Sequence, residues 1–163
     1  MRKLESFKAR KPNSLLDWYK AKSPLAVAWN YCIISLCKVT PSLSVKRFLL
    51  RLTGMKIGKN VAPGLGVQFD IFFPELIEIG DNTVIGYGAT ILAHEFLVKE
   101  HRTGEVRIGK NAMIGANSTL LAGITIGDNA TIAAGAVVTD NVRKGKMVSG
   151  VPAKEKKSRN NLK

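Results

Sequence analysis

The chain contains 163 residues, with 25 Lys and Arg against 12 Asp and Glu, so it is long enough for one domain with extensions and carries a net charge of +13. Its two cysteines, Cys32 and Cys37, lie in an apolar stretch, which argues against a disulfide framework and leaves too few ligands for a zinc site. The longest apolar run, residues 25–36, is shorter than the roughly 20 residues of a membrane-spanning helix, and the charged start does not resemble a signal peptide, so a cytoplasmic protein is expected.

The positive charge is concentrated at the two ends of the chain. Residues 1–56 have 12 basic and 2 acidic residues, residues 57–142 have 5 basic and 9 acidic residues, and residues 143–163 have 8 basic residues and one acidic residue. Together with the repeat described below, these shifts predict a basic N-terminal extension at 1–56, a central domain at 57–150 and a basic C-terminal tail at 151–163.

The N-terminal extension is predicted to form two or three helices. Ser14 can cap a first helix, Pro24 can begin a second, and a third is expected over Ser44 to Leu52, before Gly54. The third segment is amphipathic, because its apolar residues fall on one face with basic residues beside them.

Two roles are open for these helices. They can cap the open end of the repeat that follows, or they can contact the inner surface of the membrane, since tryptophans and tyrosines occur among lysines in residues 1–56. The two roles are compatible. Nucleic-acid binding is disfavoured, because no recognition helix or stacking motif accompanies the charge.

From residue 79 onward an aliphatic residue returns at every sixth position. This period fits neither a half-buried strand, which alternates every second residue, nor a helix with its period of 3.6. It is typical of a solenoid of short parallel strands, in which stacked coils bury a continuous column of side chains. The first places of the repeat are Ile79, Ile85, Ile91, Ile108, Ile114, Leu120, Ile126, Ile132 and Val138.

The fourth place of each repeat is asparagine or glycine, with one exception. Both residue types tolerate the left-handed backbone region, so the fourth place predicts a tight corner with positive φ. His94 is the exception, and a residue that breaks a folding rule is a candidate for function. The fourth places are Asn82, Gly88, His94, Asn111, Asn117, Gly123, Asn129, Gly135 and Asn141.

The repeat also extends toward the N-terminus, where it is less regular. Counting back from Ile79, its earlier first places are predicted to be Phe73, Val67 and Val61, with Ile57 outside this frame. The solenoid is therefore expected over about 57–150.

The repeat is interrupted once after residue 91. Ile91 and Ile108 are 17 residues apart, one short of three repeats, so the register slips between them. Residues 97–105 are polar and lack the pattern, and they predict a mobile loop that leaves the coil directly after His94.

The repeat, the single His94 ahead of a loop, and the run Val148-Ser-Gly-Val-Pro-Ala-Lys154 resemble the hexapeptide-repeat acyltransferases, and most of all the maltose and galactoside O-acetyltransferases. The resemblance implies a mainly β fold, a left-handed parallel β-helix, with acetyl-CoA as the acyl donor. It also implies a homotrimer with the coenzyme between neighbouring subunits. The left hand comes from the resemblance alone, because ordinary parallel crossovers are right-handed.

Acyl transfer from a thioester to a hydroxyl calls for a base that titrates near neutrality, which histidine supplies. His94 is the candidate catalytic base, because it is fixed on the coil whereas His101 lies in the expected loop, near the acceptor. Glu95 is the nearest residue in sequence that could orient the imidazole. Asp70 could hydrogen-bond a sugar hydroxyl or His94, since the resemblance places its region in the acceptor pocket. The alternative is that His94 is a corner residue and nothing more.

For the coenzyme, the resemblance implies five contact positions. Ala116 and Ala134 match positions whose backbone faces the thioester and pantetheine, and Thr139 matches a position near the adenine. Pro152 and Lys154 match a stretch near the 3′-phosphate, where lysine supplies a point charge.

The chain departs from the family pattern at two coenzyme positions. Met113 stands where several sugar acetyltransferases have a tryptophan against the pantetheine, and Asp140 stands where a lysine is common near the phosphates. Both departures affect what the resemblance implies about the geometry and affinity of coenzyme binding.

The sequence thus predicts an acetyl-CoA-dependent O-acetyltransferase that acts on a sugar or glycan hydroxyl by direct transfer, without an acyl-cysteine. N-acyl transfer to an amino sugar and O-acetylation of serine use the same base and stay open, as does a non-catalytic β-helix scaffold. A metalloenzyme like the γ-carbonic anhydrases is disfavoured, because His94 and His101 are too few ligands, and no metal is expected.

Overall fold

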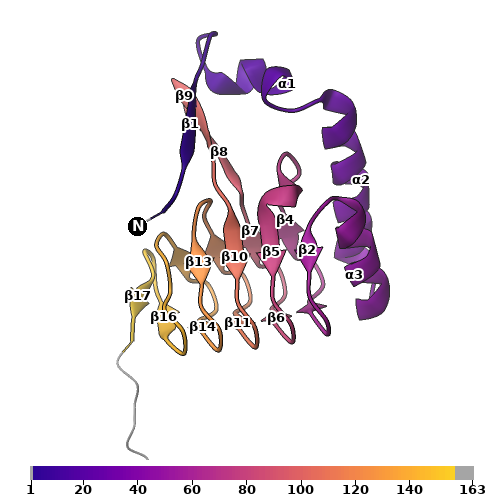
Figure 1. Cartoon of the computed structure of the whole chain (residues 1–163), viewed down its shortest axis with the longest axis vertical. Coiled ribbons are helices and arrows are strands. Elements are labelled where there is room, and N and C mark those ends of the chain that lie inside the picture. Colours follow the sequence, from indigo (N-terminus) through magenta and orange to yellow (C-terminus); the bar gives the residue numbers. More distant parts are fainter. Residues whose placement is uncertain (1, 157–163) are drawn as a thin grey trace, which may run out of the picture.

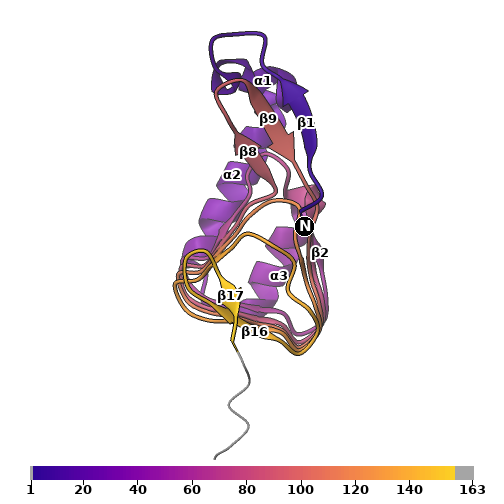
Figure 2. The same ribbon diagram turned by 90° about the vertical axis from the view of Figure 1, so that its left-hand side faces the viewer.

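The computed structural model describes residues 2–156 and shows a triangular coil of short parallel strands with helices packed at one end (Figures 1 and 2). The helical segments are η1 (Ser14–Asp17), α1 (Trp18–Ala21), α2 (Pro24–Val39), α3 (Leu43–Leu52) and η2 (Pro74–Leu76). Two of the helix starts differ from the predicted caps: Asn13 caps η1 and Ser42 caps α3, while Pro24 begins α2 as predicted.

Three parallel sheets form the faces of the coil. The first contains β2 (Lys56–Ile57), β5 (Ile77–Ile79), β10 (Val106–Ile108) and β13 (Thr125–Ile126). The second contains β3 (Ala62–Pro63), β6 (Val84–Ile85), β11 (Met113–Ile114), β14 (Thr131–Ile132) and β16 (Met147–Ser149), with β17 (Lys154–Glu155) antiparallel at its edge. The third contains β4 (Gln68–Phe69), β7 (Thr90–Ile91), β12 (Thr119–Leu120) and β15 (Val137–Val138).

The six-residue repeat explains this arrangement. Each first-place aliphatic residue pairs with the first-place residue of the next coil, as Ile114 does with Ile132 and Leu120 with Val138, and these side chains are buried in one column. The helices that precede the coils and the three parallel sheets are those of a left-handed parallel β-helix, which confirms the predicted fold class.

The corner prediction is confirmed for most fourth places. Seven of the nine have positive φ, and the two that do not are His94 and Asn141. His94 lies in the extended strand β8 (His94–Phe96), so the inference that it replaces a left-handed corner is wrong. It differs from the other fourth places because the chain leaves the coil at this point.

The predicted register before residue 79 is also wrong. Ile57 pairs with Ile79 and Phe69 pairs with Ile91, so the first places of the first coil are Ile57, Pro63 and Phe69. Ile57 and Ile79 are 22 residues apart, whereas Ile108 and Ile126 are 18 apart, and the four extra residues fall between β4 and β5. This first insertion contains η2 and the residues before it.

The second insertion follows β7 and is larger than the sequence suggested. Ile79 pairs with Ile108, 29 residues away, which leaves 11 extra residues in that coil. They do not form the predicted loop but a hairpin of β8 and β9 (Glu100–Thr103), to which β1 (Glu5–Lys8) adds a third antiparallel strand (Figure 1). Both insertions leave the third sheet at the same corner of adjacent coils, so they lie one above the other.

The N-terminal helices close the β2 end of the coil (Figure 1). Ile34 and Cys37 of α2 and Leu50 of α3 belong to the same buried cluster as the first coil. Lys46 of α3 is buried as well, and its ammonium donates hydrogen bonds to the carbonyls of Pro63 and Gly64. Within residues 2–156 none of the helices is both long and apolar enough to cross a membrane.

Candidate active site

His94 lies where the two insertions meet, and its imidazole faces Asp70. Asp70 is the first residue after β4 and His94 begins β8. His94 Nδ1 is 2.5 Å from Asp70 Oδ2, and the Asp70 side chain is fully buried while that of His94 is 14% exposed. A carboxylate on Nδ1 leaves Nε2 as the ring nitrogen free to accept a proton.

The Asp70 carboxylate is fixed by the backbone around it. Oδ1 accepts hydrogen bonds from the N–H groups of Phe72 and Phe73, at 2.8 and 2.9 Å, and Oδ2 accepts one from Ala93 at 2.7 Å. Burial by itself raises the pKa of Asp70, but the hydrogen bond and charge of His94 and the backbone N–H groups outweigh burial and hold the pKa below its ordinary value. Asp70 is therefore a rigid, ionised partner for the imidazole.

Aromatic side chains surround the imidazole. The ring centroids of Phe72 and Phe96 lie 4.7 and 4.9 Å from that of His94, and Phe73 lies at 6.0 Å. Trp18 of α1 packs edge-on against Phe72 at 5.9 Å, so the N-terminal segment reaches this site. These phenylalanines were not among the predicted site residues, although the run Phe69-Asp-Ile-Phe-Phe-Pro74 contains two of them next to Asp70.

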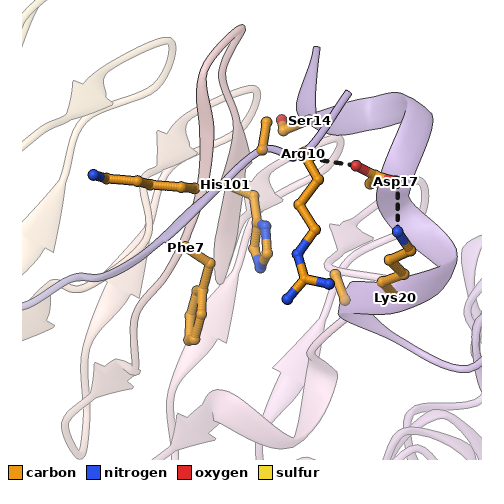
Figure 3. A pocket seen from close by; sticks show the side chains of 9 residues that line it. Phe7, Arg10, Ser14, Asp17, Lys20 and His101 are labelled. Atoms are coloured by element: carbon orange, nitrogen blue, oxygen red, sulfur yellow. Dashed lines mark hydrogen bonds and ion pairs between the residues drawn. The ribbon is translucent and has the colours of Figure 1, made fainter. Parts of the chain in front are cut away.

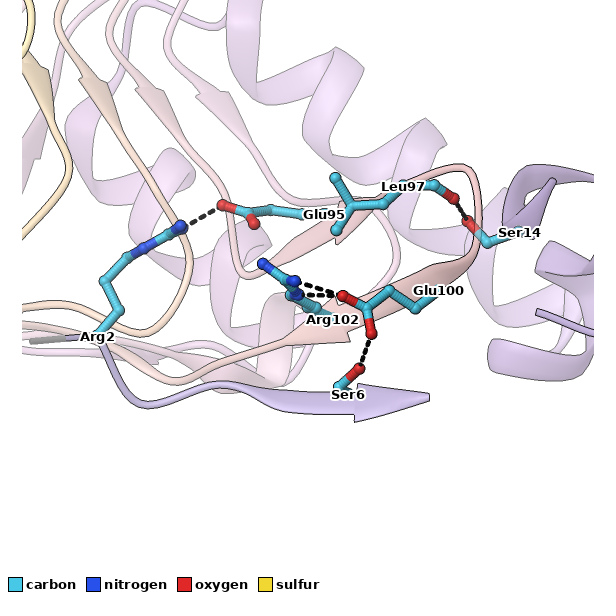
Figure 4. Close-up of polar contacts among 7 residues, drawn as sticks. All are labelled: Arg2, Ser6, Ser14, Glu95, Leu97, Glu100 and Arg102. Atoms are coloured by element: carbon cyan, nitrogen blue, oxygen red, sulfur yellow. Dashed lines mark hydrogen bonds and ion pairs between the residues drawn. The ribbon is translucent and has the colours of Figure 1, made fainter. Parts of the chain in front are cut away.

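The structure does not bring Glu95 to the imidazole. Neighbouring residues of a strand point to opposite faces, so Glu95 lies on the other side of β8 from His94 and Phe96. Its carboxylate pairs with Arg2, beside a second network in which Glu100 binds Ser6 and Arg102 (Figure 4). The carboxylate that contacts the His94 ring is therefore that of Asp70, and not that of Glu95 as expected from the sequence.

His101 lies in β9, opposite Phe96, and not in a mobile loop. Its ring stacks on Phe7 of β1, with centroids 4.8 Å apart, and also touches Phe96 at 5.8 Å. Burial, followed by repulsion from the imidazole of His94 when that ring is protonated, lowers the pKa of His101. His101 is thus on the same face of the hairpin as His94, one aromatic ring away.

The five predicted coenzyme residues fall at two edges of the third sheet. Ala116 and Ala134 stack in adjacent coils at its edge with the second sheet, where Gly135 donates a hydrogen bond to the Ala116 carbonyl, and Pro152 and Lys154 follow β16 at the same edge. Thr139 follows β15 at the opposite edge, below the corner where His94 leaves the coil. The turn at Gly135 and the strand β15 separate Ala134 from Thr139.

Comparison with known proteins agrees with this fold. Residues 105–140 match the family model described as the hexapeptide repeat of succinyl-transferase. The Bacillus subtilis (strain 168) protein named "Putative acetyltransferase YvoF" is 43% identical over 153 residues, which cover 93% of this chain and 89% of that protein.

This chain belongs to the hexapeptide-repeat acetyltransferases.

Solved structures of such acetyltransferases share the fold. The hexapeptide-repeat acetyltransferase VCA0836 from Vibrio cholerae superposes with a TM-score of 0.69 at 17% identity, covering 92% of this chain and 97% of that one, and it has also been solved with acetyl coenzyme A. A galactoside acetyltransferase in complex with coenzyme A gives a TM-score of 0.62 at 22% identity, covering 82% of this chain and 80% of that one. The predicted enzyme class, an acetyltransferase, is confirmed by the relative from Bacillus subtilis.

Proposed function

We propose that this acetyltransferase transfers an acetyl group from acetyl-CoA directly to a hydroxyl of a sugar or glycan, with His94 as the general base and Asp70 as its positioning residue. The observation that supports this most is the contact between a buried, ionised carboxylate and Nδ1 of an imidazole whose Nε2 has no hydrogen-bond partner among residues 2–156. Acetyl-CoA is the expected donor because related structures hold coenzyme A or acetyl coenzyme A.

The proposed reaction needs a single proton carrier. His94 Nε2 accepts the proton of the acceptor hydroxyl as its oxygen forms a bond to the acetyl carbonyl carbon. The carbon–sulfur bond of the thioester then breaks, and the imidazolium returns the proton to the departing thiolate. Asp70 holds the ring with Nδ1 protonated and stabilises the charge that the ring gains.

The coenzyme positions support an assembly in which two copies share each site, and we propose the homotrimer implied by the family resemblance. In one chain, Ala116 and Ala134 lie an entire strand away from the corner that holds His94. When the sheet edge that contains Ala116 and Ala134 packs beside the corner that holds His94 in a neighbouring copy, the groove between the two copies contains the alanines and the histidine. Lys154 is exposed at the rim of this groove and can contact a phosphate.

An acceptor screen tests the proposed function. The purified protein is mixed with acetyl-CoA and a panel of neutral, amino and acidic sugars, and thiol release and product mass are followed. We expect an acetylated sugar whose acetyl group is released by hydroxylamine, as for an ester. A product stable to hydroxylamine would show N-acylation, and thiol release that no sugar stimulates would contradict acetylation of a sugar.

A further inference from the structure

A cavity lies beside the aromatic cluster, between the tip of the β1–β9 pairing and α1 (Figure 3). Its volume of about 480 Å³ is within the range of small-molecule sites. The lining includes the stacked rings of Phe7 and His101 together with Arg10, Asp17 and Lys20. A flat aromatic surface next to polar groups suits one sugar ring, which can lie against it by its apolar face.

The polar groups of this cavity are only partly used within the chain. The Arg10 guanidinium extends into the cavity, and none of the contacts of the described residues pairs it with a carboxylate (Figure 3). Asp17 accepts a hydrogen bond from the backbone N–H of Arg10 through Oδ2. Its other oxygen, Oδ1, is buried and accepts no hydrogen bond from the described residues, and its ion-pair partners Lys20 Nζ and Lys11 Nζ lie 3.4 and 3.9 Å away. Buried polar atoms without a partner are uncommon and suit a ligand that supplies one.

The cavity is on the same side of the hairpin as the imidazole of His94. His101, which lines it, touches Phe96, and Phe96 touches His94. Trp18, one residue after Asp17, touches Phe72, which also packs on His94. An acceptor longer than one sugar unit can therefore span from the cavity to Nε2 of His94.

We propose that this cavity binds a sugar unit that carries a negative charge, so that the acceptor of the acetyl group is an anionic glycan. This inference rests on the proposed function, because it assumes that the protein acetylates a sugar or glycan. In it, Arg10 and Lys20 bind the anionic group, Asp17 Oδ1 accepts a hydrogen bond from a hydroxyl, and the Phe7–His101 stack supports the ring.

Binding measured without any reaction tests the cavity separately from the enzyme activity. Glucose, glucose 6-phosphate and glucuronic acid are titrated into the full-length protein, and backbone amide shifts are followed by NMR. We expect at least one of the two charged sugars to bind about tenfold or more tightly than glucose, and to shift amides of residues 7–10 and 101. Which of the two binds better distinguishes a phosphate from a carboxylate.

The matched variants are Arg10→Gln and Lys59→Gln, the latter an exposed lysine of the coil outside the cavity. We expect Arg10→Gln to remove the preference for charged sugars and Lys59→Gln to keep it. Equal binding of glucose and the charged sugars, a preference that survives Arg10→Gln, or no binding of any probe would overturn the proposal. Failure of acetyl transfer in the acceptor screen would refute the proposed function and leave these binding results unaffected.

The outer face of α2 and α3 exposes large apolar side chains. The residues that α2 presents to solvent include Leu25, Trp29, Leu36 and Val39, and those of α3 include Val45, Phe48 and Leu52. Leu25 is 83% exposed, Val39 73% and Phe48 60%. On α2 the exposed positions recur at helical spacing, and the Trp29 indole N–H donates to the Leu52 carbonyl, so the two helices form one continuous apolar face. Such an extended patch marks an interaction surface.

The segment that forms this face carries charges of one sign, and Lys22 and Lys56 of that segment pair with Glu75 and Glu78 of the coil. Residues 18–69 contain no Asp or Glu, and they include eight Lys and Arg. Arg47 and Arg51 donate to backbone carbonyls of the first coil, so these contacts leave their charges uncompensated. An apolar face that contains a tryptophan, on helices whose charged residues are all cationic, matches the polar–apolar boundary of an anionic bilayer.

We infer that the face of α2 and α3 docks on an anionic lipid surface. Sedimentation with vesicles of phosphatidylcholine alone or with added phosphatidylglycerol tests this. We expect binding to the anionic vesicles, and about a tenfold or larger loss in the variant Leu36→Ser/Phe48→Ser, whereas Val84→Ser, an exposed apolar residue of the coil, keeps it. Equal binding to both kinds of vesicle, or binding to neither, would overturn the inference. A double variant that changes the oligomeric mass but not vesicle binding would also overturn it, and would point to a protein partner.

Discussion

The variant His94→Ala is expected to lower kcat for acetyl transfer by about 100- to 10,000-fold, the usual contribution of a general base. Without the imidazole, the acceptor hydroxyl must attack the thioester without a proton acceptor within reach. The KM for acetyl-CoA should change little, because His94 is not one of the residues expected to contact the coenzyme. The measurement is initial rates of thiol release with a saturating acceptor from the screen.

Loss of folding must be separated from loss of the base in this experiment. His94 is partly exposed and its contacts are with Asp70 and aromatic rings, so His94→Ala should still give the far-ultraviolet circular dichroism of the parent. Added imidazole should restore part of the rate if the missing group is a proton acceptor. A folded His94→Ala that retains the parental kcat would contradict the mechanism.

The variant Asp70→Asn is expected to lower both activity and stability. An asparagine at this position can still accept from Phe72 and Phe73 through its oxygen, but its amide nitrogen faces the Ala93 N–H and Nδ1 of His94, which are also donors. We expect kcat to fall about 100-fold or more, because the ring is no longer held in the required tautomer. A buried donor without a partner should cost about 1–3 kcal/mol of unfolding free energy.

The pH dependence of stability gives a second signature of Asp70. Because its pKa is lowered in the folded protein, the stabilisation from its ionised form is present above the ordinary value of 3.8 and is lost as the pH falls through the lower folded value. As the pH is lowered from about 4 toward 2, the midpoint of thermal unfolding should therefore fall more steeply for the parent than for Asp70→Asn.

Asp128→Asn is the matched control for this carboxylate. Asp128 also accepts a backbone hydrogen bond, from Lys110, but it lies in the coil away from His94. We expect its variant to keep kcat within about twofold. Equal losses in both variants would mean that the effect of Asp70→Asn is general destabilisation and not its contact with His94.

The regular part of the fold could be predicted from the sequence because its physics is local. Each face of the coil is determined by one repeat, which has a buried aliphatic residue at its first place and, in most repeats, a left-handed corner at its fourth. The predicted first places from Ile108 to Val138 are therefore correct. The interrupted coils could not be counted in the same way. Counted back from Ile79, Phe73 and Val67 fit the six-residue spacing and Phe69 and Pro63 do not, yet strand pairing gives the first places to Phe69 and Pro63.

The same limit explains which parts of the site were found. His94 was identified for an incorrect reason, since it begins a hairpin and has no left-handed backbone, yet its position at an interruption of the repeat was informative. Asp70 and Glu95 could not be ranked, because adjacency in sequence favoured Glu95 while the stacking of two insertions at one corner favoured Asp70. The pairing of β1 with β9 is a contact across more than 90 residues and has no local signature.

A double-mutant cycle on kcat with His94→Ala, Asp70→Asn and the combined variant tests most directly whether the two residues act as one unit. If Asp70 contributes to catalysis only through the imidazole, the combined variant should be no slower than His94→Ala alone, to within about twofold. Losses that multiply in the combined variant would show that Asp70 acts independently of His94 and would contradict the proposed mechanism.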